Sequence, residues 1–163
     1  MTTMTVETKT VLEILTVMPH RLLSISKGFD DSQLHLIPNG EYWSANDILA
    51  HVRACSDVWG KSILAMVTQN HPTMRYISPR TWIRKTNYPE QEFYLSLKAY
   101  KKQRRELINA LRPLKSKDWL RGATFTATTK DREPTVLSYT QRIVQHESEH
   151  FIQLEDLLKR IRK

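Results

Sequence analysis

The chain has 163 residues, a length that suits one domain with a hydrophobic core and leaves little room for a second. Hydrophobic residues make up 40% of it and glycine contributes only 4 residues, a helix-forming usage that predicts a single all-α domain over residues 1–163. The formal net charge is +8, and the excess lies between Arg75 and Arg132, where 15 Lys and Arg stand against 5 Asp and Glu. One cysteine excludes an internal disulfide bond.

The first helix is predicted from about Val6 to Lys27. Apolar residues recur there at alternating steps of four and three, the spacing of a seam that packs in a helix bundle: Val11, Leu15, Met18, Leu22 and Ile25. Pro19 lacks an N–H group, so a kink is expected in the turn before it. Gly28 is the expected end of this helix.

The second helix has a clear start signal. Ser44 is followed three residues later by Asp47, a spacing that predicts a capping box, and the helix should continue to about Val67. On a helical wheel of 100° per residue, His51 lies within the apolar side. We therefore expect His51 on the buried face.

The third helix is predicted from about Glu90 to Arg112, after the 19-residue connection HPTMRYISPRTWIRKTNYP. That length is enough to cross the whole bundle, so helices two and three can run parallel. The stretch TFTATT is expected to be extended without forming a sheet. Pro134 is expected to open the fourth helix, where a proline is well tolerated.

Three histidines form the most informative pattern in the chain. His146 and His150 are four residues apart, which on a helix places their Cβ atoms about 5–6 Å from each other. A third imidazole from His51 would complete a site with three nitrogen ligands and open positions for water or substrate. Such a site suits a divalent metal ion, Zn²⁺ or Ni²⁺ first and Fe²⁺ as a further candidate. The other histidines are not part of such a pattern and are expected on the surface or in loops: His20, His35 and His71.

The string HESEH also matches the HExxH pattern of zinc peptidases. Only 13 residues follow His150, which leaves little room for a distant third ligand. The extended form of the pattern needs a glycine where Gln153 stands. The sequence therefore argues against a peptidase, although Glu147 inside the apolar stripe must still find a hydrogen-bond donor, a proton or a metal.

Two segments, WSANDILAHVRACSDVW and YTQRIVQHESEHFIQLE, resemble the DinB/YfiT-like superfamily of four-helix metal-binding proteins. Members of that family carry one histidine on the second helix and an HxxxH pair on the fourth, commonly with glutamine soon after. The resemblance implies an up-down-down-up bundle in which His51, His146 and His150 are the metal ligands. It also implies activities such as S-transfer with low-molecular-weight thiols, a mycothiol-dependent isomerisation, or metal-dependent hydrolysis.

These observations predict a metal-dependent enzyme of the thiol S-transferase or hydrolase type that acts on a small molecule. A divalent cation on three histidines would activate a water or a low-molecular-weight thiol. Glu147 is the candidate catalytic residue, as a proton acceptor beside the ligands. Basic residues of the long connection would hold carboxylates of a thiol cofactor or an anionic substrate: Arg75, Arg80, Arg84 and Lys85.

The alternative is a non-catalytic protein that uses its basic middle segment, with Arg104 and Arg105 among the contacts, to bind nucleic acid or another anionic partner. Nucleic acid is disfavoured, because no groove-reading motif accompanies the charge. Cys55 follows His51 by one turn and is expected to be a small buried hydrophobe, with a fourth metal ligand and a redox-sensitive neighbour of the site as the other interpretations. The sequence offers no membrane span or export signal, which predicts a cytoplasmic protein, and a homodimer is plausible.

Overall fold

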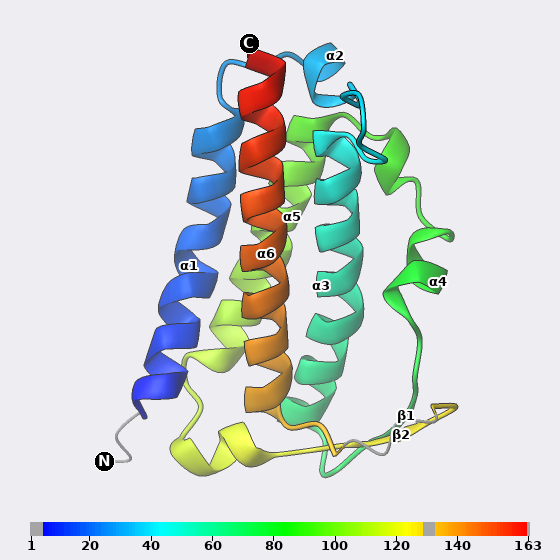
Figure 1. Cartoon of the computed structure of the whole chain (residues 1–163). Helices are drawn as coiled ribbons and strands as arrows, with labels where there is room; N and C mark the ends of the chain where they lie inside the picture. Colours follow the sequence, from blue (N-terminus) through cyan, green and yellow to red (C-terminus); the bar gives the residue numbers. More distant parts are fainter. Residues whose placement is uncertain (1–4, 129–132, 163) are drawn as a thin grey trace.

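The computed structural model describes residues 5–128 and 133–162, in which four long helices form a bundle (Figure 1). The long helices are α1 (Val6–Ser26), α3 (Ala45–Thr68), α5 (Phe93–Leu111) and α6 (Val136–Arg162). Helix α1 packs against α5 and α6, and α3 packs against the same two helices. The predicted all-α four-helix bundle is confirmed.

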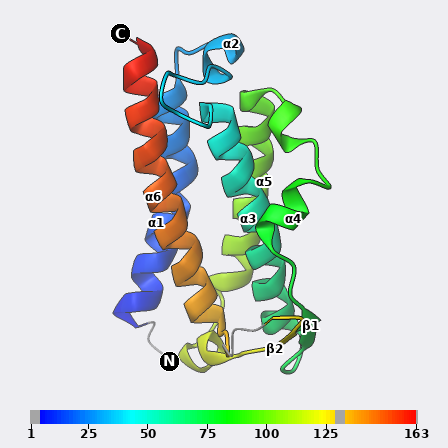
Figure 2. The same ribbon diagram turned by 45° about the vertical axis from the view of Figure 1, so that its right-hand side comes forward.

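A long crossover connects α3 to α5. From the lower end of α3 in Figure 1 the chain passes through three short elements and enters α5 at the opposite end of the bundle. These elements are β1 (Thr73–Arg75), α4 (Pro79–Ile83) and the 3₁₀-helix η1 (Tyr88–Glu90). Helices α3 and α5 therefore run parallel while α1 and α6 run the other way, as the turned view also shows (Figure 2). This is the predicted up-down-down-up order.

The remaining short elements lie at the ends of the bundle. Helix α2 (Asp31–Leu34) sits in the connection from α1 to α3, and the 3₁₀-helix η2 (Ser116–Leu120) follows α5. The stretch TFTATT contains β2 (Thr124–Thr126), which pairs in parallel with β1 so that Thr73 faces Thr124. The extended conformation was expected, whereas the pairing was not, because its partner strand comes from the crossover some fifty residues earlier.

Local sequence signals predicted one helix start correctly and another incorrectly. The capping box of α3 is formed: the Asp47 amide donates to Ser44 Oγ at 3.1 Å, and the Ser44 amide donates to Asp47 Oδ2 at 2.9 Å. Pro134 does not open α6, contrary to expectation. Thr135 caps that helix, since its hydroxyl accepts the Ser138 amide at 3.0 Å and α6 begins at Val136.

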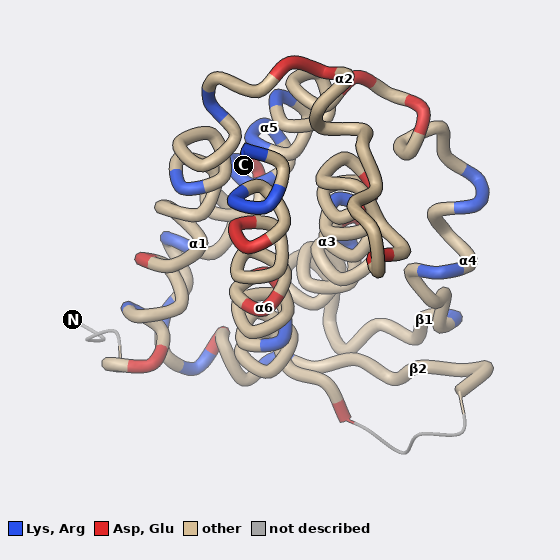
Figure 3. Tube along the Cα trace, turned by 45° about the horizontal axis from the view of Figure 1, so that its top comes forward, with Lys and Arg blue, Asp and Glu red and all other residues tan. Residues whose placement is uncertain are grey.

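Two groups of buried apolar side chains fill the bundle. One group includes Leu15 and Ile63, and the other includes Ile48 and Phe93, all four essentially inaccessible to solvent. No helix in the described part of the chain is both long and apolar enough to span a membrane. Lys and Arg occur on α1, α4, α5 and α6 alike (Figure 3), so the basic residues are spread around the bundle.

Candidate metal centre

Three imidazole rings from two helices meet between α3 and α6. His51 lies on α3, and His146 and His150 lie one turn apart on α6. The Nε2 atom of His146 is 3.0 Å from His51 Nε2 and 3.1 Å from His150 Nε2. The structure therefore brings the three predicted ligand residues together through the same ring atom of each.

Hydrogen bonding among the rings alone leaves this arrangement incomplete. An imidazole Nε2 has either one proton or one lone pair, so His146 Nε2 can form a well-directed hydrogen bond with only one of its two neighbours. His146 Nδ1 is also buried and has no partner among the described residues. A cation that accepts lone pairs from all three Nε2 atoms fits the donor set, because neutral imidazole is a common ligand of first-row divalent metals.

The ring of His150 is oriented by its neighbour on α6. His150 Nδ1 lies 2.8 Å from Gln153 Oε1. A carbonyl oxygen can only accept, so Nδ1 carries a proton, and in the neutral ring the lone pair is then on Nε2, the atom that lies beside His146. The glutamine that the family resemblance puts after the HxxxH pair thus has a physical role in this chain.

Cys55 lies closer to the cluster than its expected role as a core residue requires. It is buried, and its Sγ atom is 3.6 Å from His51 Nε2 and 3.8 Å from His146 Nε2. The ligand atoms of His51, Cys55 and His146 all lie within 4.8 Å of one another, so these three residues also form a group that could hold a metal ion. Two overlapping donor sets therefore exist, and both contain His51 and His146.

The protonation of these groups suits metal binding by the histidines. Burial, with the nearby His150 and Arg80, lowers the pKa of His51 to about 4. Burial and the neighbouring His150, His51 and Arg142 lower the pKa of His146 to about 3. Burial and the Glu147 carboxylate raise the pKa of Cys55 to about 12. At neutral pH both imidazoles are unprotonated and the thiol keeps its proton, so the rings are available as ligands without competition from protons.

Two tryptophans flank the cluster. The ring centroid of Trp43 is 5.0 Å from that of His51 and 6.1 Å from that of His150, while the Trp59 ring meets His146 edge-on at 5.0 Å. Trp43 stands just before the cap of α3 and Trp59 two turns after His51. Their spacing in the sequence does not predict that they lie beside the histidines, since aromatic residues at such positions also occur in ordinary cores.

Glu147 points away from the histidine cluster, into the bundle. Its carboxylate accepts hydrogen bonds from Ser56 Oγ on α3 and from the Tyr100 hydroxyl on α5, both at 2.9 Å. The two terminal nitrogens of Arg104 also donate to it, one at 2.9 Å, and form a buried ion pair. The donor that the sequence required for Glu147 is thus identified. Its predicted role as a proton acceptor stays a prediction, and both of its oxygens are already engaged.

The burial of Arg104 corrects one expectation. Only 2% of its surface is exposed, and its charge is compensated by Glu147, so it is not available to contact nucleic acid. The sequence pattern missed this because Arg104 lies within a run of basic residues that otherwise face solvent. The alternative function therefore loses one of its expected contacts, while the rest of the basic segment is unaffected by this finding.

The remaining histidines lie apart from the cluster. His20 and His71 are exposed, and His71 Nε2 lies 3.0 Å from Thr124 Oγ1. His35 is half-buried beside Asp31, with His35 Nδ1 3.4 Å from a carboxylate oxygen. The expectation that these three belong to the surface or to loops agrees with their positions.

Comparison with known proteins agrees with this architecture. Residues 14–154 match the DinB superfamily. YfiT from Bacillus subtilis, described as a probable metal-dependent hydrolase with an unusual four-helix bundle topology, has a similar structure, with a TM-score of 0.80 and 18% sequence identity over 97% of this chain and 90% of that one. No curated protein sequence is significantly similar. Since the family match covers most of the bundle, the chain belongs to the DinB superfamily.

Proposed function

We propose that this protein is a metal-dependent enzyme that holds a divalent cation through His51, His146 and His150 and catalyses hydrolysis or thiol S-transfer on a small molecule. The observation that carries the proposal is the approach of two imidazole Nε2 atoms to His146 Nε2, at 3.0 and 3.1 Å. The description of YfiT as a probable metal-dependent hydrolase supports the hydrolytic form of the proposal.

A divalent cation at this position would lower the pKa of a water from above 15 to roughly 7, or deprotonate a thiol, and so supply a nucleophile at neutral pH. The chain's own residues prepare the site. Gln153 orients the ring of His150, and the rings of Trp43 and Trp59 lie against the histidine rings. Arg75, Arg80, Arg84 and Lys85 are exposed on the crossover, where they are available to an anionic substrate or thiol.

The test begins with untagged protein and mass spectrometry of its metal content. We expect about one equivalent of Zn²⁺, Ni²⁺ or Fe²⁺, because a preformed three-histidine site binds tightly. Two reactions then separate the chemistries: hydrolysis of 4-nitrophenyl acetate, and transfer of cysteine to monochlorobimane, in which a C–S bond forms and chloride leaves. Activity should disappear on chelation and return with the metal. Less than about a tenth of an equivalent of metal would contradict the proposed metal site. Bound metal without either activity would contradict the proposed enzymatic function.

The choice between His150 and Cys55 as third ligand has its own spectroscopic test. In protein reconstituted with Co²⁺, a thiolate ligand gives a charge-transfer band in the near ultraviolet, which imidazole ligands lack. We expect no such band in the wild type, and unchanged metal binding in Cys55→Ser, because the Nε2 atoms of His51 and His150 both lie closer to His146 Nε2 than Cys55 Sγ does. A band that vanishes in Cys55→Ser would instead assign the metal to His51, Cys55 and His146.

Gln153 should affect metal affinity although it is not a ligand. Replacement by alanine removes the acceptor that orients His150. Loss of a residue that hydrogen-bonds to a metal ligand typically lowers the metal affinity about 10–100-fold. We therefore expect Gln153→Ala to bind Zn²⁺ at least about 10-fold more weakly in competition titrations. Gln145→Ala is the matched control, since Gln145 is exposed on the same helix and donates a hydrogen bond to the exposed Glu149. Equal affinities of the two variants would show that His150 needs no such orientation.

A further inference from the structure

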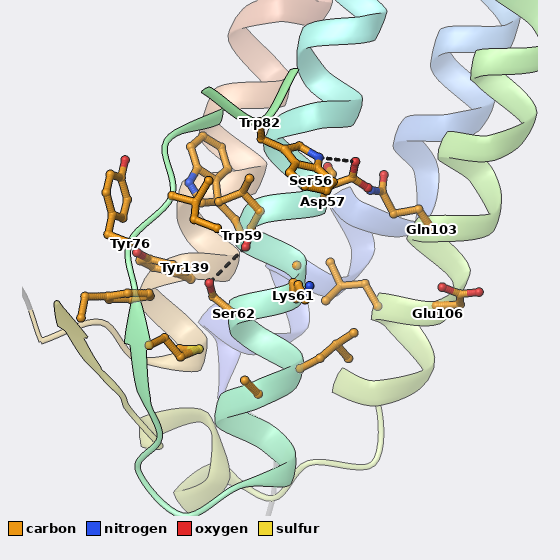
Figure 4. A pocket seen from close by; sticks show the side chains of 18 of the residues that line it. Ser56, Asp57, Trp59, Lys61, Ser62, Tyr76, Trp82, Gln103, Glu106 and Tyr139 are labelled. Carbon is orange, nitrogen blue, oxygen red and sulfur yellow. Dashed lines mark hydrogen bonds between the residues drawn. The ribbon is translucent and has the colours of Figure 1, made fainter. Parts of the chain in front are cut away.

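A pocket of about 600 Å³ lies beside Trp59. It is bounded by α3, α5 and the crossover, and none of the three histidines lines it. Figure 4 shows Tyr76 and Tyr139 on one side of it and Gln103 and Glu106 of α5 on the other. Trp59 is the shared wall, because it lines the pocket and also contacts His146.

The lining is mainly apolar and rich in aromatic rings. The rings come from four parts of the chain, namely α3, the crossover, β2 and α6: Trp59, Tyr76, Trp82, Tyr88, Phe125 and Tyr139. A volume of this size with aromatic walls and few polar groups is typical of sites for small organic molecules. Formation of the pocket requires the crossover, so it is a product of the parallel arrangement of α3 and α5.

Gly60 provides a second observation, independent of the pocket's volume. It lies in the interior of α3, where glycine destabilises a helix by about 0.5–1 kcal/mol relative to alanine. It is buried and lines the pocket, yet a Cβ atom built on it would have no atom within 4 Å. Its backbone does not need the conformational freedom of glycine, since its φ is not positive. The missing side chain therefore keeps the pocket open.

The charges of the lining balance. Asp57 and Glu106 are matched by Lys61 and Arg75, and the charge of Arg104 is compensated by Glu147 outside the lining. Asp57 is held in place by three neutral donors: Trp82 Nε1 at 3.0 Å, the Tyr88 hydroxyl at 2.6 Å, and the Gln103 amide. A pocket without a net charge favours an uncharged occupant, because an ion would lose its hydration without a compensating partner.

Two buried polar atoms on lining side chains have no hydrogen-bond partner among the described residues. One is an acceptor, Gln103 Oε1, and the other is a donor, the indole N–H of Trp59. Neither atom is exposed on the surface of the pocket, so these two groups do not select for an occupant that forms hydrogen bonds.

We propose that this pocket is a second ligand site, which takes a small uncharged aromatic molecule. The site is independent of the metal centre, so it stands whether or not the proposed enzymatic function is correct. Binding is expected to be the same in metal-loaded and chelator-treated protein.

The test uses two rigid probes that share one skeleton: 3-phenyl-2-quinolinone, and its 4-carboxylate, which adds a charge. Titration followed by fluorescence should give saturable binding of the first with a Kd of about 0.2 mM or tighter, the ordinary efficiency of a ligand of this size. The carboxylate should bind at least about 10-fold more weakly. Absence of saturable binding overturns the site, and equal or tighter binding of the carboxylate overturns the assigned chemistry.

Position 60 supplies the matched variants. Gly60→Leu fills the pocket and should weaken binding of 3-phenyl-2-quinolinone more than about 10-fold, while Gly60→Ala should have a much smaller effect. Neither should lower the melting temperature or the metal content, since both residues favour a helix more than glycine does. If Gly60→Leu fails to fold, Gly60→Met fills the same space with a flexible chain. Unchanged binding in a folded, filled variant would place the probe elsewhere and overturn the proposal.

Discussion

Replacing Glu147 by leucine lowers the melting temperature by about 6–20 °C. The substitution leaves the guanidinium of Arg104 buried without its carboxylate, and breaking a buried ion pair from one side costs about 3–5 kcal/mol. In a domain of this size each kcal/mol corresponds to about 2–4 °C. Thermal unfolding followed by circular dichroism measures the shift.

Two variants show whether this loss comes from the unpaired charge. The double variant Arg104→Met with Glu147→Leu removes both charges and should recover most of the stability, because an apolar pair of similar volume replaces the ion pair. Glu149→Ala, on the exposed side of the same helix, should shift the melting temperature by no more than about 2 °C. A Glu147→Leu variant as stable as the wild type would mean that Arg104 finds another partner, and that the ion pair does not hold α5 to α6.

Replacing His146 by alanine abolishes stable metal binding. Both short contacts in the cluster involve His146 Nε2, and both candidate donor sets contain this residue. We expect the affinity for Zn²⁺ to fall by more than about 100-fold, because orienting partners alone are worth about 10–100-fold. The metal content of the purified variant, measured by mass spectrometry, should drop below about a tenth of an equivalent.

His20→Ala serves as the control for this loss. His20 is an exposed histidine on α1, so its removal changes the histidine count without touching the cluster. It should retain about one equivalent of metal. If His146→Ala kept its metal while folding normally, the ion would be bound outside the cluster and the proposed centre would be wrong.

The sequence predicted the long helices well because their signals are local. Apolar spacing located α1, and the Ser44 and Asp47 pair located the first turn of α3. The start of α5 was placed three residues early, since Tyr88–Glu90 forms a separate 3₁₀ turn. The start of α6 was placed at Pro134, although the hydroxyl of Thr135 caps the helix. Errors at ends arise because a few competing hydrogen bonds decide them.

The candidate site was predictable in its histidines and not in its surroundings. Spacing of four residues fixes His146 and His150 on one side of any helix, and the position of His51 on an apolar face directs it inward. The same face contains Cys55, but only the packing of α3 on α6 brings its sulfur within 3.6 Å of His51 Nε2. The distance between side chains on two helices depends on how the helices are rotated and shifted relative to each other, and no local sequence pattern specifies this.

By itself, the sequence determined that this chain forms a bundle of helices with three histidines facing inward, because the spacing of residues along a helix decides which of them share a face. Tertiary structure alone decided where Glu147 points. Its neighbours in sequence are metal-ligand candidates, yet its partners are Ser56, Tyr100 and Arg104, which lie 43 to 91 residues away. The pocket beside Gly60 is likewise a tertiary feature, since its walls come from five separate parts of the chain. A residue's type sets what it can bind, and the packing of distant segments decides what it meets.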